Sequence, residues 1–249
     1  MPLKIFLLFF TLLIISETTL ASSDTTYFYY DSLWVETESK GAVFIGKSYP
    51  TEKGQFLLDI ERMDGQVAMS GSFKDKDLNL PIGVFKYYND NGDLETSLSF
   101  NPLSELRKRV DYYPSGNVRY LQYINLPDSV KANMEEYFYL SEEGVKMDFS
   151  IPRTPVKSKK SSTKNPDRFM NEIISHSNMI KQYGYVNMTI LPDKTARIKR
   201  FMIPVTPDIY KKVSDLVSIP IYESAKLNGE KVDYNWIFMA EVKSTLISN

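Results

Sequence analysis

The sequence contains no cysteine and one histidine, His176. Without cysteine the chain has no disulfide, no thiolate metal site and no cysteine for a lipid anchor. One histidine cannot supply an H-E-x-x-H zinc site, and the G-x-S-x-G, P-loop and G-x-G-x-x-G motifs are all missing. The adjacent carboxylates Glu135–Glu136 and Glu142–Glu143 point to different faces, which favours solvated surface over acid–base chemistry. We therefore expect no enzyme, no metal and no cofactor.

The sequence has one apolar run, Ile5 to Ile15, interrupted by Thr11 and preceded by Lys4. It is shorter than the roughly 20 residues of a spanning helix, and Thr19-Leu20-Ala21 offers small residues for cleavage. We predict that residues 1–21 are a signal peptide, which implies an exported protein with no stable membrane span. The alternative is a retained inner-membrane anchor. Export also argues against a nucleic-acid partner.

The charge is divided between two halves. Residues 22–150 hold 13 Lys and Arg against 21 Asp and Glu, whereas residues 151–249 hold 16 against 9. The change falls in residues 151–166, a Lys-, Ser- and Pro-rich stretch without apolar periodicity. We interpret 151–166 as a basic linker, more simply a solvated spacer than a binding patch for an anionic ligand. It separates domains at 22–150 and 167–249.

The acidic half contains a repeat. Turn glycines occur at Gly65, Gly92, Gly116 and Gly144, spaced by 27, 24 and 28 residues, and aromatic pairs or triplets precede the last three. Such a period indicates stacked units, and alternation such as that of Leu94 to Phe100 makes each unit a β-hairpin. These hairpins resemble MORN-like repeats. We expect the tyrosines to pack in the core and between repeats rather than to form a ligand shelf.

The C-terminal half has a different pattern. Tyr185–Leu191 and Ala196–Met202 alternate as two strands of a hairpin around Pro192-Asp193-Lys194. Thr206-Pro207-Asp208 begins a helix with Ile209, Val213, Leu216 and Val217 on one face, and Pro220 ends it. Asn228-Gly229 then turns into a last strand, Lys231–Val242. A further helix from Pro166 to Tyr183 is expected to pack on the sheet.

This half resembles the C-terminal domain of TonB, the periplasmic energy transducer of bacteria with outer membranes. The resemblance rests on Tyr183-Gly184-Tyr185-Val186 and on the segment Ile219 to Val232, with its proline, aromatic, alanine and Asn-Gly-Lys-Val. Tyr222 stands where the family usually has Trp, and Ser224 where it often has proline. The expected fold class is α+β: an antiparallel β-hairpin repeat domain, a basic linker and a small α+β TonB-like domain.

The resemblance implies that the last strand binds a short segment of an outer-membrane receptor or other envelope protein by β-strand addition, in TonB-dependent transport across the outer membrane. Exposed strand edges bind peptides in this way because their backbone groups are unpaired. The candidate partner-binding residues are Val232, Asp233, Tyr234, Asn235, Trp236, Ile237, Phe238 and Met239. Alternation predicts that Tyr234 and Trp236 pack on the helix and that Asn235 and Ile237 face solvent or the partner. The alternatives are a homodimer through the same edge, self-protection by residues 243–249, and a structural cell-envelope module acting through its repeats.

Overall fold

The computed structural model describes residues 24–124, 137–150, 181–191, 196–217 and 224–243. The predicted signal peptide, the predicted linker, His176 and the turn Pro192-Asp193-Lys194 lie outside these residues, as does Pro220. Of the helix expected from Pro166 to Tyr183, the described part, Lys181 to Tyr183, is strand instead.

The first half forms one nine-stranded antiparallel sheet in which every strand pairs with the next strand along the chain. Its strands are β1 (Thr26–Tyr30), β2 (Phe44–Pro50), β3 (Phe56–Arg62), β4 (Val67–Phe73), β5 (Pro81–Tyr88), β6 (Leu94–Phe100), β7 (Leu106–Tyr112), β8 (Val118–Tyr123) and β9 (Tyr137–Tyr139). A short 3-10 helix, η1 (Ser39–Gly41), lies between β1 and β2. We call these nine strands the repeat sheet.

The predicted turn glycines lie in equivalent turns at one end of the repeat sheet. Gly65, Gly92, Gly116 and Gly144 all have positive φ, between 82° and 86°. In each turn the glycine N–H donates to the carbonyl three residues earlier, as Gly92 does to Asn89 at 3.0 Å, and the chain closes with a bond such as Asn89 N–H to Asp93 at 2.9 Å. A residue in the left-handed region closes this three-residue hairpin loop, and glycine adopts that region without strain. Each sequence repeat therefore corresponds to two strands and one such turn.

One face of the repeat sheet carries its aromatic core. Phe73, Phe85 and Phe100 meet edge to face, with ring centroids 5.2 and 5.1 Å apart. Leu58, Ile60 and Tyr87 are fully buried beside them. As expected, tyrosines serve packing: Tyr30 and Tyr87 are buried, whereas Tyr88 is half-buried.

The second half forms a three-stranded sheet in the order β12-β11-β15, from β11 (Lys181–Ile190), β12 (Ala196–Phe201) and β15 (Tyr234–Lys243). The helix α4 (Pro207–Val217) contacts β12 and β15. Asp208 in its first turn forms an ion pair with Lys212, and Ile209 and Val213 are buried against the sheet. The predicted helix after Thr206 is confirmed.

A smaller sheet joins the two halves, in the order β10-β13-β14. It comprises β10 (Phe149–Ser150), β13 (Ala225–Leu227) and β14 (Glu230–Val232). Asn228 and Gly229, both with positive φ, form the predicted tight turn between β13 and β14. The long last strand predicted from Lys231 is interrupted at Asp233.

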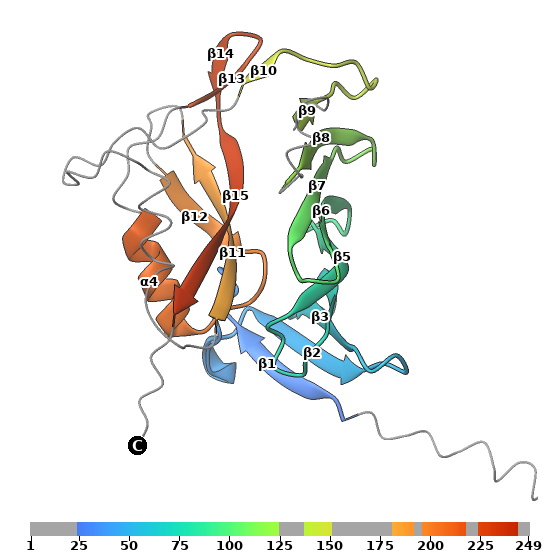
Figure 1. Ribbon diagram of the computed structural model, residues 1–249, viewed down its shortest axis with the longest axis vertical. Helices are drawn as coiled ribbons and strands as arrows, with labels where there is room; N and C mark the ends of the chain where they lie inside the picture. Colours follow the sequence, from blue (N-terminus) through green and yellow to red (C-terminus); the bar gives the residue numbers. More distant parts are fainter. Residues whose placement is uncertain (1–23, 125–136, 151–180, 192–195, 218–223, 244–249) are drawn as a thin grey trace, which may run out of the picture.

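The two large sheets pack against each other, as Figure 1 shows for β11 and β15 beside β5 to β8. One hydrophobic core contains Trp34, Tyr87 and Leu98 of the first half together with Met202 and Ile237 of the second. The hydroxyl of Tyr87 donates to the carbonyl of Met202 at 2.8 Å. The halves predicted as separate domains therefore share a core.

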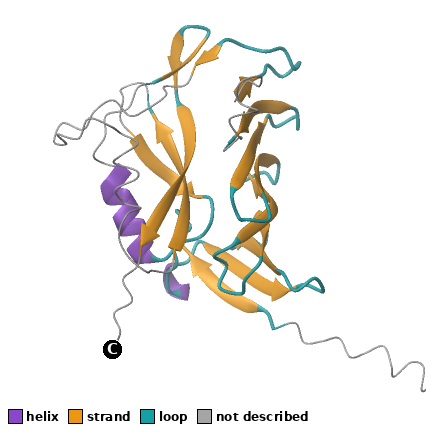
Figure 2. Cartoon of the chain, in the orientation of Figure 1, coloured by secondary structure: helices purple, strands orange, loops and turns teal. Residues whose placement is uncertain are grey.

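The predicted α+β class is wrong. The protein is mostly β, and α4 is the one α-helix in the described part of the chain (Figure 2). The prediction assumed that helices would cover the C-terminal sheet. Instead α4 covers one face, and side chains of the repeat sheet cover the other.

Candidate functional site

The predicted partner-binding segment lies at one side of the C-terminal sheet. Val232 ends β14, Asp233 is exposed between strands, and Tyr234 to Met239 lie in β15. β15 pairs with β11 over its whole length, from Tyr234 opposite Ile190 to Lys243 opposite Lys181. The side chains of Trp236, Phe238 and Met239 lie outside the described part of the structure. Their backbones continue the antiparallel pairing with β11.

The two faces of β15 are both covered at its start. Tyr234 is buried in a cluster that also contains Ile209 and Val213 of α4, and its ring contacts Tyr120 of β8 and Phe149 of β10, with centroids 6.3 and 5.9 Å apart. Ile237 was expected to face solvent or a partner, and this is wrong: it is 5% exposed and belongs to the core shared with the repeat sheet. Alternation defines two faces of a strand, but it does not reveal that a distant sheet covers Ile237.

Backbone contacts cover other strand edges of the molecule. At β12, the N–H of Phe201 donates to Leu33 at 3.0 Å, and Val205 just beyond the strand bridges to Val35. At β1, the N–H of Thr37 donates to Tyr29 at 2.9 Å, and Tyr30 bridges to Glu36. Short loops thus cover the last one or two residues of these edges, a common protection against unwanted strand pairing.

The last strand of the repeat sheet is covered at its end in the same way. At β9, the N–H of Met147 donates to Tyr139 at 2.8 Å, next to the bridge between Leu140 and Lys146. Along the ten residues of β15, by contrast, the described residues provide β11 as the only backbone partner. We call the side of β15 away from β11 the open edge.

One side chain of the repeat sheet reaches the backbone of β15. Arg109 of β7 donates from Nη1 to the carbonyl of Asn235 at 2.6 Å. Its Nε and Nη2 donate to the two carboxylate oxygens of Asp111 at 2.9 and 2.6 Å. Arg109 and Asp111 are 2% and 5% exposed, and Thr96 donates to Asp111 at 3.1 Å. The guanidinium is thereby fixed in one orientation.

Asp111 stabilises the buried charge of Arg109. Burial opposes the charged form of Arg109, but Asp111 outweighs it and raises the pKa of the guanidinium above its ordinary value. The guanidinium also lies 5.1 Å from the ring centre of Tyr120, whose hydroxyl is 3.4 Å from that of Tyr234. Burial raises the pKa of both tyrosines. The neutral phenol is therefore the favoured form of both side chains.

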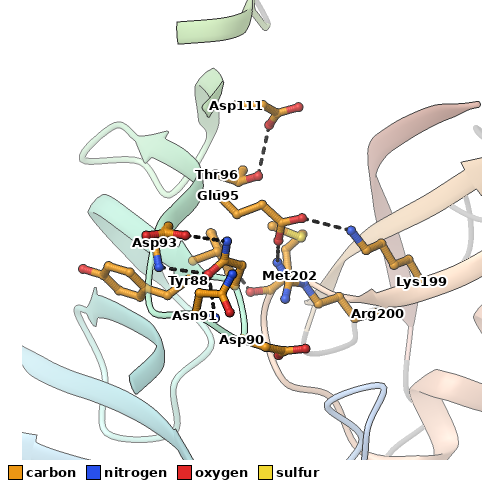
Figure 3. A network of polar contacts seen from close by, with 12 residues as sticks. Tyr88, Asp90, Asn91, Asp93, Glu95, Thr96, Asp111, Lys199, Arg200 and Met202 are labelled. Carbon is orange, nitrogen blue, oxygen red and sulfur yellow. Dashed lines mark hydrogen bonds and ion pairs between the residues drawn. The ribbon is translucent and has the colours of Figure 1, made fainter. Parts of the chain in front are cut away.

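A second polar contact between the halves involves Glu95 of β6. Its carboxylate accepts from Lys199 and from Arg200 of β12, each at 3.1 Å (Figure 3). Burial tends to raise the pKa of Glu95, but Arg200 and Lys199 outweigh it and lower the pKa. Arg200 also lies over the rings of Trp34 and Tyr87, at 5.0 and 5.5 Å. The acidic and basic halves therefore meet through defined ion pairs.

Sequence reasoning missed Arg109, Asp111, Glu95 and Arg200. The alternation of Arg109 and Asp111 about Val110 places two opposite charges on the same face of a strand. That face is the one bearing the buried core, so the pattern could have marked a buried ion pair. It could not have named Asn235, which is 126 positions away along the chain.

The described residues hold few groups for chemistry. They contain no cluster of three or more potential metal ligands. Glu142 and Glu143 are exposed in a turn, as expected. No helix within the described ranges is both long and apolar enough to cross a membrane.

Comparisons with known proteins add little. No protein-family model matches the chain, and no curated protein matches it. One solved structure that resembles it is that of a mutant of S. aureus TarM in complex with fondaparinux, alpha-GlcNAc-glycerol and UDP. The match has 12% identity and a TM-score of 0.26, and covers 47% of this chain but 22% of that chain. A similarity of this size carries no argument about fold or activity.

Proposed function

We propose that this protein is an exported, non-enzymatic binding protein of the periplasm, which takes up an extended peptide segment as an added strand on β15. The observation that carries the proposal is the contrast between strand edges. Loops pair with the last residues of β1, β9 and β12, whereas β15 has β11 as its only backbone partner among the described residues. A strand edge with no neighbouring strand is a template for a further strand.

The resemblance of this half to the TonB C-terminal domain supports the same site and suggests the kind of partner. That family pairs its last strand with a short segment of an outer-membrane receptor. The partner proposed here is such a receptor or another envelope protein, and the process is transport across the outer membrane. The MORN-like repeats would then hold the binding sheet in place.

The direction of the backbone groups on β15 determines the experiment. In an antiparallel strand the N–H and C=O of one residue point to the same edge, and successive residues alternate. We take the bond from Arg109 to mean that the Asn235 carbonyl points away from β11. The amides of Ile237, Met239 and Glu241 then lie on the open edge.

Proline at Met239 tests the site, because proline removes the amide hydrogen that an added strand would use. Proline at Asn235 or Ile237 is less suitable, since Asn235 accepts a bond from Thr189 at 2.9 Å and Ile237 is buried. Met239→Ala is the matched control, because it shortens the side chain and keeps the amide hydrogen. Both variants are checked for folding by circular dichroism and thermal unfolding.

The probe is a set of peptides copied from the N-terminal periplasmic segments of outer-membrane receptors of the same organism, measured by isothermal titration calorimetry. We expect Met239→Ala to bind within about twofold of wild type and Met239→Pro to bind roughly tenfold more weakly, the effect of one or two lost backbone hydrogen bonds. A folded Met239→Pro variant with unchanged affinity would exclude β15 as the site. Dimers of the wild type that Met239→Pro dissociates would identify a second copy as the occupant.

A further inference from the structure

We infer that the repeat sheet limits how much of β15 a partner can reach, and that Arg109 closes the first part of the open edge. This inference rests on the function proposed above. It adds that the partner strand pairs only with the second part of β15, Phe238 to Lys243, and that Arg109 sets this limit.

The contact itself occupies a position that an added strand needs. A strand paired along the full open edge would donate an amide to the carbonyl of Asn235. That carbonyl already accepts the 2.6 Å bond from Arg109. A bond from a guanidinium is stronger than one from a neutral amide, so a peptide amide does not readily replace it.

The surroundings of the contact strengthen the closure. Tyr234 and Ile237, on either side of this point, are buried at 6% and 5% exposure. Arg109 cannot easily swing away, because Asp111 holds it through two bonds and would be left as a buried unpaired carboxylate. Pairing over Tyr234 to Ile237 would thus require the two sheets to separate.

Two changes to the repeat sheet remove the closure in different ways. The triple variant Thr96→Val, Arg109→Met, Asp111→Leu replaces the whole buried polar cluster by apolar side chains of similar size, so that no unpaired charge remains. Arg109→Lys keeps a charge beside Asp111 but loses the planar guanidinium that bonds Asp111 and Asn235 together. Arg109→Lys is measured instead if the triple variant does not fold. Glu95→Gln is the matched control, because it weakens a contact between the halves that does not involve β15.

The first measurement needs no partner. Amide hydrogen exchange of the full chain, followed by NMR, compares Ile237 with Met239 and Glu241, with Met188 in β11 as internal reference. We expect slow exchange at Ile237 and fast exchange at Met239 and Glu241 in the wild type and in Glu95→Gln. In the triple variant, exchange at Ile237 should become at least tenfold faster while Met188 is unchanged. Equal exchange at Ile237 and Glu241 in the wild type overturns the inference.

The second measurement uses two nested receptor peptides, of about five and nine residues, in the same calorimetric assay. The wild type should bind both within twofold, because the longer peptide finds no further edge. The triple variant should bind the longer peptide roughly tenfold more tightly than the shorter. A similar gain from length in the wild type overturns the inference. One further outcome separates the two claims. If neither protein binds any peptide, but amide exchange at Ile237 is slow in the wild type and fast in the triple variant, the closure by Arg109 is supported and the proposed function is contradicted.

Discussion

The repeat sheet and the C-terminal sheet β12-β11-β15 differ in how their edge strands are covered. The repeat sheet is a meander in which each strand pairs with its neighbours in sequence, and loops cover the ends at β1 and β9. In the C-terminal sheet a loop pairs with the last residue of β12, whereas no loop pairs with β15 in the described part of the chain. Under the proposed function, the repeat sheet is the scaffold and the C-terminal sheet is the part that binds.

The sheets also differ in what holds them together. Local turns and neighbouring strands form the repeat sheet, so its contacts are close in sequence. The C-terminal half is held by residues that are distant in sequence. Tyr87 donates a hydrogen bond to the carbonyl of Met202, and Arg109 donates one to the carbonyl of Asn235. The following changes test these two kinds of support separately.

Arg109→Ala should have the largest effect on stability. It removes the partner of Asp111 and leaves a buried carboxylate unpaired, which costs about 3–5 kcal/mol of unfolding free energy. Urea denaturation measures this change. The double variant Arg109→Met, Asp111→Leu should recover most of the loss, because both charges are gone. A loss below about 1 kcal/mol in Arg109→Ala would contradict the buried pair.

Gly71→Ala should destabilise the repeat sheet. A Cβ atom at Gly71 would lie 2.3 Å from the ring of Phe85, so the aromatic row must shift. Overpacking of this kind costs about 1–3 kcal/mol. Ser72→Ala, on the opposite face of the same strand, should change the unfolding free energy by less than about 0.5 kcal/mol. Equal effects of the two substitutions would show that Phe85 does not pack over Gly71.

Glu95→Gln should have a smaller effect, about 0.5–1 kcal/mol, because the ion pairs with Lys199 and Arg200 are partly exposed. The lowered pKa of Glu95 sets the direction of the pH dependence. Glu95 stabilises the protein above its unfolded pKa of about 4.3, and the contribution is lost as the pH falls through the lower folded pKa. Unfolding free energies of wild type and variant should therefore differ at pH 7 and converge in acid. A constant difference would contradict this.

Cleavage of the predicted linker within residues 156–164 should have the smallest effect. On charge and composition alone, residues 22–150 and 167–249 were predicted to be two separate domains. Because both halves contribute to one core, we now expect the cleaved chain to stay associated. Size-exclusion chromatography after limited trypsin treatment measures this. Two separate peaks under native conditions would restore the original prediction.

Local features were predictable from the sequence, and long-range ones were not. The turns at Gly65, Gly92, Gly116 and Gly144 and the helix after Thr206 depend on residues within a few positions, and each was identified. The α+β class was wrong because it assumed that helices cover the C-terminal sheet. The prediction that Ile237 faces solvent or a partner was wrong for a similar reason. Alternation defines two faces of a strand but does not show what covers them.

The candidate site was predictable in part. The sequence located the strand but not the state of its edge, because closure depends on contacts such as Arg109 with Asn235 and Leu33 with Phe201. No pattern within β15 distinguishes a covered edge from an open one. That property belongs to the assembled sheets.

The central claim is that β15, unlike the closed edges, accepts a partner strand. Paramagnetic relaxation measured by NMR tests it most directly, with a nitroxide label on a bound receptor peptide and the full chain isotopically labelled. We predict that the label broadens the amide signals of Phe238 to Lys243 more strongly than those of β1, β9 and β12. Broadening centred on β12 or on the repeat sheet, with β15 unaffected, would contradict the account.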